Sequence, residues 1–149
     1  MNLSHPGNTP PSRVLGIDYG ERKIGLAVSS EDGKFVFGRG ILRASSVQEV
    51  LDRIRHICGE DGITTIIVGM PFAKDGGRGD SARAVEAFVQ KLRAATPLPV
   101  VLEDERMTSL LAQRLSHEAG ESGKDDDELA AKVLVEGYLE RNYSSDTPI

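Results

Sequence analysis

Residues 14–42 read VLGIDYGERKIGLAVSSEDGKFVFGRGIL, and this stretch decides the fold class. It contains three apolar, β-prone runs, at 14–18, 24–29 and 35–42, which are divided by connections that hold Gly20 and Gly33. Short strands with glycine-bearing connections are typical of an antiparallel meander. The stretch therefore predicts three consecutive antiparallel strands.

After the meander, the hydrophobic pattern changes its period. Residues 46–49 read SVQE, which is a capping-box pattern, and apolar residues then recur at helical spacing as far as Ile57. The continuous apolar run 63–68 predicts a strand that is buried on both faces. A helix and a central strand should therefore follow the meander.

The second half of the chain continues this alternation. A glycine-rich loop at 69–79 precedes a helix that either Asp80 or Ser81 could cap, and Pro97 ends this helix. The remaining predicted elements are a strand at 100–102, a helix from Thr108, a linker at 119–124 and a helix at about 126–141. The order β-β-β-α-β-α-β-α-α predicts an α/β fold, in which a mixed sheet carries helices packed on its faces.

The length of 149 residues suits one domain. We expect a flexible N-terminal extension at 1–12, a single domain at 13–142 and a flexible tail at 143–149. A single cysteine, Cys58, excludes an internal disulfide, and no apolar run resembles a signal peptide or a membrane span. These features predict a cytoplasmic protein without membrane contact.

The net charge of −5 argues against a protein that coats nucleic acid, because such binding depends on Lys and Arg neutralising phosphates. Six basic residues nevertheless lie between Arg13 and Arg43, against four acidic ones. A local basic patch together with a bound cation would still allow the protein to act on nucleic acid.

Three groups of acidic residues could carry chemistry, and Asp18 is the first. It lies at the end of the first predicted strand and precedes a tight turn with Gly20. A carboxylate in this position can point into a cleft, although an isolated aspartate before such a turn more commonly only shapes it. By itself, Asp18 leaves both interpretations open.

The second group, residues 103–106, reads EDER and follows the strand at 100–102. Strand alternation puts Glu103 and Glu105 on one side and Asp104 on the other, so the three carboxylates cannot all face one site. A solvated strand end would also explain the group. The spacing alone does not decide which acid faces a site.

The third group, residues 125–128, reads DDDE and opens the last predicted helix, where the helix dipole favours acids in any case. Asp127 differs from its neighbours because it shares a helical face with Ala130, Ala131 and Leu134. The two alanines suit close packing on the sheet. This packing would direct Asp127 inward.

Together these groups offer three separated carboxylates. Hard cations such as Mg²⁺ require oxygen ligands, and such a cluster supports phosphodiester hydrolysis. The three histidines and Cys58 lack the spacing of a zinc site or a catalytic triad. The 69–79 loop does not match a Walker loop, but Lys74 and Arg78 could reach phosphate if it is more than a connection.

Four stretches resemble the YqgF/RuvX family of pre-16S rRNA nucleases and Holliday junction resolvases. They are LGIDYGERKIGLAVS (15–29), IIVGMPFAKDG (66–76), LEDERMTS (102–109) and DELAAKVLVEGYL (127–139). They occur in the family's order and cover nearly the whole chain between its two ends. The resemblance implies a ribonuclease H-like fold with a five-stranded mixed sheet and a site of the RuvC resolvase type.

The resemblance also implies the site residues. The Asp of the family's GIDxG motif falls on Asp18, the Glu of its DER motif on Glu105 and the Asp of its DxxAA motif on Asp127. These three acids would be the catalytic residues and the ligands of Mg²⁺ or Mn²⁺, and water activated by the metal would attack the phosphodiester. The expected phosphate contacts are Arg22, Lys23 and Arg106, with Lys74 and Arg78 from the loop.

As substrate, the resemblance favours the 5′ end of precursor 16S rRNA, with a four-way DNA junction second. Cleavage of a junction would require a symmetric homodimer, whereas a single RNA cut requires only a monomer. The chain departs from the family in three places: Arg22-Lys23 replaces the usual Lys-Arg order, Ser30 stands where an Asp commonly ends the second strand, and further acids precede Asp127 in place of the usual apolar residue.

Two other functions are compatible with parts of the sequence. An actin-like or sugar-kinase-like ATPase also has Asp-x-Gly after its first strand, but that fold needs two such domains. A non-catalytic RNA-binding module for ribosome assembly would suit the acidic pI and the altered positions 22, 23 and 30. A nuclease assay distinguishes the enzyme from this module.

Overall fold

The structure of the protein is a computed structural model, which describes residues 13–20, 22–43, 45–71, 80–104 and 126–143. Its strands are β1 (Val14–Asp18), β2 (Ile24–Ser29), β3 (Val36–Leu42), β4 (Thr65–Met70) and β5 (Val100–Asp104). Its helices are α1 (Val47–Asp61), α2 (Asp80–Ala95) and α4 (Asp126–Tyr143). The predicted helix from Thr108, the linker at 119–124 and the N-terminal extension lie outside the described residues.

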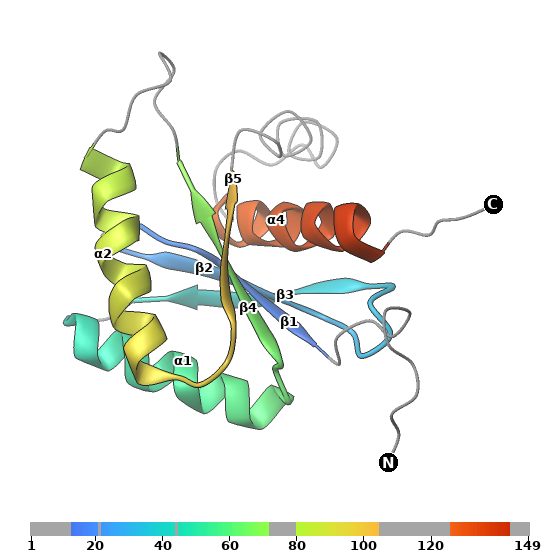
Figure 1. The fold of residues 1–149 in the computed structure, drawn as a ribbon, viewed down its shortest axis with the longest axis horizontal. Coiled ribbons are helices and arrows are strands. Elements are labelled where there is room, and N and C mark those ends of the chain that lie inside the picture. Colours follow the sequence, from blue (N-terminus) through green and yellow to red (C-terminus); the bar gives the residue numbers. More distant parts are fainter. Residues whose placement is uncertain (1–12, 21, 44, 72–79, 105–125, 144–149) are drawn as a thin grey trace.

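The five strands form one mixed sheet in the order β3-β2-β1-β4-β5 (Figure 1). β1, β2 and β3 pair antiparallel, whereas β4 pairs parallel with β1 and β5 pairs parallel with β4. This arrangement confirms the predicted meander followed by parallel strands, with helices on both faces. The parallel strands place the ends of β1, β4 and β5 at one edge of the sheet.

The bounds of three strands differ from the prediction: β3 begins at Val36 instead of residue 35, β4 begins at Thr65 instead of residue 63, and both β4 and β5 end later than predicted. Gly69, which the sequence pattern assigned to a loop, belongs to β4, because it pairs with Glu103 in the ladder between β4 and β5. The same ladder extends β5 beyond the predicted residue 102 as far as Asp104, which pairs with Met70. Backbone pairing thus continues past the point where the apolar run ends.

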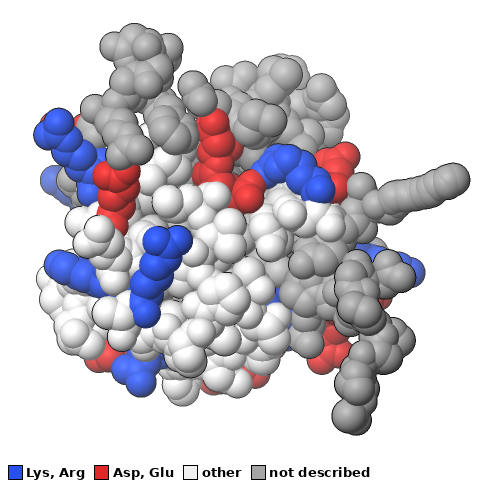
Figure 2. All heavy atoms as spheres, viewed as in Figure 1, with Lys and Arg blue, Asp and Glu red and all other residues white. Residues whose placement is uncertain are grey.

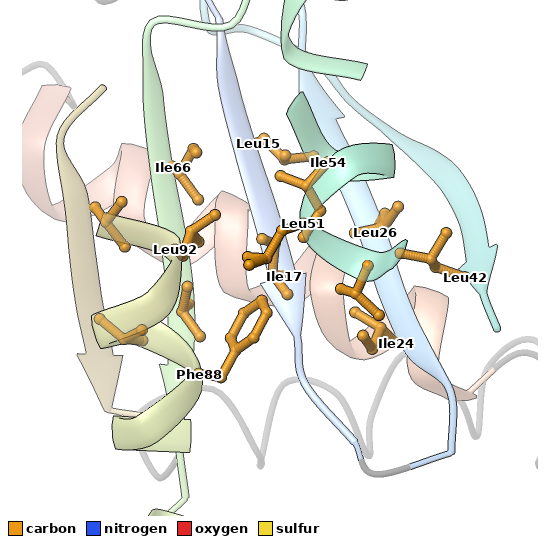
Figure 3. Close-up of a cluster of buried hydrophobic side chains, with 14 of the residues drawn as sticks. Leu15, Ile17, Ile24, Leu26, Leu42, Leu51, Ile54, Ile66, Phe88 and Leu92 are labelled. Carbon is orange, nitrogen blue, oxygen red and sulfur yellow. The ribbon is translucent and has the colours of Figure 1, made fainter. Parts of the chain in front are cut away.

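The two faces of the sheet carry two separate apolar clusters. α1 and α2 cover the first face, where Phe88 of α2 and Ile54 of α1 lie over the side chains of β1 and β2 (Figure 3). α4 covers the other face and packs across β1, β2 and β3. The α4 cluster consists of Val14, Ala27, Ile67, Ala131, Leu134, Val135 and Leu139.

α4 lies close to β1 at residue 16, which has no side chain. A Cβ at Gly16 would overlap the Cγ2 methyl of Val135 and lie 3.2 Å from the carbonyl oxygen of Ala131. Ala131 itself is fully buried, as its small side chain predicted, whereas Ala130 is only half-buried. A glycine on the strand and an alanine on the helix therefore bring the two backbones together.

α1 begins at the residue that the capping-box pattern predicts. The Ser46 hydroxyl oxygen accepts the backbone N–H of Glu49 at 3.1 Å, as expected of an N-cap. The Glu49 carboxylate, however, accepts from the backbone N–H and hydroxyl of Ser45, one residue before the cap. The helix ends at Gly62, whose φ of 68° is typical of a C-cap glycine. No helix of the described ranges is long and apolar enough to span a membrane.

Replacing Gly59 by alanine should stabilise the protein. Gly59 lies inside α1, and nothing lies within 4 Å of the position its Cβ would take. Alanine restricts the unfolded chain more than glycine does, so we expect a gain of about 0.5–1 kcal/mol. Urea denaturation of the two proteins measures it; a midpoint at or below that of the wild type would contradict the prediction.

Candidate active site

The candidate site lies at the edge where β1, β4 and β5 end. Ile17 pairs with Val68, and Gly69 pairs with Glu103, so the next row across the three strands consists of Asp18, Gly69 and Glu103. Strands in a sheet are about 4.8 Å apart, which puts the backbones of Asp18 and Glu103 roughly 10 Å from each other. The glycine between them contributes no side chain to this row.

Asp18 lies on the α4 side of the sheet. Val14 belongs to the α4 cluster, a Cβ at Gly16 would meet α4, and strand alternation puts Asp18 on the same face. Asp18 is half-buried. Its neighbour Tyr19 stacks on Phe88 of α2, with ring centroids 4.3 Å apart, which fixes the chain directly after the carboxylate.

Glu103 is held by a partner that the sequence did not reveal. Its carboxylate forms an ion pair with the Arg141 guanidinium from the last turn of α4, and the Glu103 side chain is only 13% exposed. Acidic and basic side chains accordingly lie side by side where β5 ends (Figure 2). The two residues are 38 positions apart in the sequence. No local pattern could therefore have predicted the ion pair, and the only hint was that charged residues occur in both segments.

The alternation predicted for residues 103–105 is confirmed as far as the structure describes them. Glu103 faces α4, as its ion pair shows, whereas Asp104 has the parity of Val100, which packs on the α1 and α2 side. Glu105 lies outside the described residues. Asp127 is placed only as a backbone position in the first turn of α4, one turn before Ala131.

The described residues contain no group of three or more His, Cys, Asp or Glu side chains that could hold a metal ion. Two of the three predicted ligands, Glu105 and Asp127, have side chains outside the described set. The donors of the Asp18 edge are carboxylate oxygens, which suit a hard divalent cation better than a soft one. The chemistry of these donors therefore fits the predicted metal.

The predicted phosphate contacts are only partly described. Arg22 is exposed and lines a pocket of about 160 Å³ together with Tyr19, Ser45 and Ser46, on the face that α1 covers. Lys23 is half-buried in the same turn and makes interactions of its own. The other three predicted contacts, Arg106, Lys74 and Arg78, lie outside the described residues. Asp18 and the pocket that Arg22 lines are therefore on opposite faces of the sheet.

Ser30, which replaces the usual Asp after the second strand, organises the turn between β2 and β3. Its hydroxyl donates to Asp32 Oδ1 at 2.7 Å and accepts the Phe35 N–H at 3.1 Å. The bond from Ser30 and a second from the Lys34 N–H lower the pKa of Asp32. The serine therefore has a structural role that accounts for its presence at this position.

The Cys58 thiol should react slowly with alkylating reagents. Burial raises its pKa to about 11, and the thiolate is the nucleophile. At pH 8 we expect iodoacetamide to modify the folded protein roughly 100-fold more slowly than the urea-unfolded chain, whose thiol has an ordinary pKa. The rate should rise about tenfold per pH unit towards 10, and equal rates in both states would contradict this prediction.

Comparison with known proteins decides the family. Residues 12–141 match the sequence model of the family described as "RuvX: Holliday junction resolvase". The chain belongs to the RuvX family. This membership identifies it as a nuclease, a hydrolase of phosphodiester bonds that acts on nucleic acid.

Individual relatives of this RuvX family member are also named as nucleases. A protein of Anaplasma marginale (strain St. Maries) is 34% identical over 132 residues, which cover 86% of this chain and 84% of the relative. A protein of Clostridium novyi (strain NT) is 36% identical over 132 residues, which cover 86% and 98%. Both carry the name "Putative pre-16S rRNA nuclease".

Solved structures confirm the ribonuclease H-like fold. The chain resembles Thermus thermophilus RuvC, solved with a Holliday junction substrate, with a TM-score of 0.58 and 15% identity over 87% of this chain and 94% of RuvC. It also resembles the large terminase nuclease of the thermophilic phage G20c, with a TM-score of 0.56 and 9% identity over 90% and 83%. Its fold is thus that of RuvC-like nucleases.

Proposed function

We propose that this chain is a Mg²⁺- or Mn²⁺-dependent nuclease that processes the 5′ end of precursor 16S rRNA in the cytoplasm. The observation that carries the proposal is the position of Asp18, half-buried at the end of β1 on the side that α4 covers. The catalytic domain would span residues 13–142, in agreement with the family match over 12–141.

Asp18, Glu105 and Asp127 are the proposed metal ligands. In β5 the odd-numbered residues Val101 and Glu103 face α4, and Glu105 is the next odd-numbered acid. Glu103 is engaged by Arg141, and Asp104 has the opposite parity, which favours Glu105 as the ligand from this segment. When bound, the divalent ion supplies a Lewis acid and lowers the pKa of water.

The remaining roles belong to the basic side chains. Arg22 is exposed in the turn after Asp18, beside the pocket on the α1 side of the sheet, and its planar guanidinium can bind a phosphate where the substrate backbone extends past the strand ends to that side. Further phosphates of the same backbone would be bound by the ammonium groups of Lys23 and Lys74 and by the guanidinium groups of Arg106 and Arg78. Such local contacts are compatible with the net charge of −5, because each neutralises one phosphate at a time.

The experiment that tests the proposal offers two substrates to the purified protein. One is a precursor 16S rRNA fragment that includes the 5′ processing site, and the other is a four-way DNA junction; both are assayed with Mg²⁺, with Mn²⁺ and with EDTA. We expect metal-dependent cleavage of the RNA. Cleavage of neither substrate in any metal would favour the non-catalytic RNA-binding module instead.

The family's description as a Holliday junction resolvase favours DNA junctions as the second candidate substrate. Symmetric cleavage of a junction needs two active sites related by a two-fold axis, so this function requires a homodimer. Light scattering at the assay concentration distinguishes the two. A monomer that cleaves RNA supports the first proposal, whereas a dimer that cuts only the junction supports the second.

A further inference from the structure

The first turn of α4 is bonded directly to the edge strand β3. The backbone N–H of Gly40 donates to Glu128 Oε2 at 2.7 Å, across 88 positions of sequence. Gly40 has a φ of 98°, and a register irregularity interrupts the β2–β3 ladder between Leu26 and Ala27, directly opposite. The strand is thus locally irregular where it meets the Glu128 carboxylate.

A second glycine makes room for this contact. A Cβ at Gly38 would overlap the Glu128 carboxylate and lie 2.9 Å from its Cγ. Gly38 does not have a positive φ, so its backbone conformation does not require glycine. The absent side chain is therefore explained by the Glu128 carboxylate, which lies over residue 38 and reaches the N–H of residue 40.

The opposite end of α4 is also attached to the sheet. Arg141 in the last turn pairs with Glu103 at the end of β5. Since β3 and β5 are the two edge strands of the sheet (Figure 1), these contacts attach the two ends of α4 to both edges. Between them the helix rests on Gly16, where it approaches β1 most closely.

We propose that Glu128 is a positioning residue of the nuclease site: its bond to β3 fixes the helical turn that carries Asp127. Asp127 and Glu128 are adjacent in that turn, so the bond sets the height and rotation of Asp127's backbone over the sheet. This inference rests on the proposed function, in which Asp127 is a metal ligand. Residues that orient a metal ligand typically change metal affinity 10- to 100-fold when they are removed.

Four variants test the contact. Glu128→Ala removes the acceptor, whereas Glu128→Gln keeps an oxygen that can accept from Gly40. Gly38→Ala leaves Glu128 in the chain but occupies the space of its carboxylate. Glu140→Ala is the matched control, because it removes an exposed carboxylate from the same helix. For each protein, calorimetry measures the affinity for Mn²⁺ alone, and amide hydrogen exchange measures the protection of Gly40.

We expect Glu128→Ala and Gly38→Ala to weaken Mn²⁺ binding roughly tenfold and to expose the Gly40 amide to exchange. Glu128→Gln and Glu140→Ala should bind Mn²⁺ as the wild type does. The double variant Glu128→Ala/Gly38→Ala should be no weaker than the worse single variant, because both changes break one contact.

Two failures are distinguishable. Wild-type protein that binds Mn²⁺, together with a Glu128→Ala variant of unchanged affinity, would overturn the role of Glu128 and leave the proposed function standing. Wild-type protein that neither binds Mn²⁺ nor cleaves nucleic acid would overturn the proposed function, and the role of Glu128 with it. A loss of stability alone, without a change in Mn²⁺ affinity, counts against the proposal.

Discussion

Replacing Asp18 by asparagine is expected to lower the rate of phosphodiester cleavage by roughly 100-fold or more, because the loss of a metal ligand should exceed the effect of losing a group that only orients one. The amide keeps the size and the hydrogen-bonding capacity of the side chain but removes the negative charge. Asp18 is half-buried at a strand end, and Tyr19 stays anchored on Phe88, so the fold should persist. Initial rates on the precursor rRNA fragment with saturating Mn²⁺ measure the effect.

The control for this prediction is Asp52→Asn. Asp52 is an exposed aspartate of α1, on the face of the sheet opposite Asp18, and an asparagine there can still accept from Gln48. Its cleavage rate should equal that of the wild type. Equal cleavage by the Asp18→Asn and wild-type proteins would indicate a contaminating nuclease and remove Asp18 from the site.

Replacing Gly16 by valine should destabilise the fold more than any other single substitution considered. Local preference points the other way, because valine suits a β-strand better than glycine does. A Cβ at residue 16 would overlap the Val135 methyl and lie 3.2 Å from the Ala131 carbonyl oxygen, so α4 must move off the sheet. Overpacking of this kind costs roughly 3 kcal/mol. The melting temperature should fall by about 6–12 °C.

A double-mutant cycle checks the cause of this loss. Gly16→Ala alone should destabilise the protein, and the same change made in a Val135→Ala background should cost less, because the overlapping methyl is gone. Gly59→Ala, which meets nothing within 4 Å, is the control for a general effect of removing glycine. An equal cost of Gly16→Ala in both backgrounds would show that Val135 is not the obstacle.

Much of the fold could be predicted because its signals are local. The strand runs of the meander, the helix that starts at Ser46 and the apolar run of β4 each span a few residues whose spacing follows the period of one element. Gly69 was misassigned because glycine signals a loop by itself, while its membership in β4 depends on pairing with Glu103, 34 residues later in the numbering.

The acids of the site show the same division. The sequence by itself determined that carboxylates occur at the end of β1, at and after the end of β5 and at the start of α4, and the family resemblance singled out Asp18, Glu105 and Asp127 among them. Only the tertiary structure decided that the Glu103 carboxylate pairs with Arg141 and that the Glu128 carboxylate accepts the Gly40 N–H. These contacts join residues that are 38 and 88 positions apart in the sequence, and contacts over such separations leave no periodic pattern from which they could be predicted. The position of Asp18 can thus be predicted from the local pattern of the first strand, whereas the contacts that attach α4 to the sheet depend on tertiary packing.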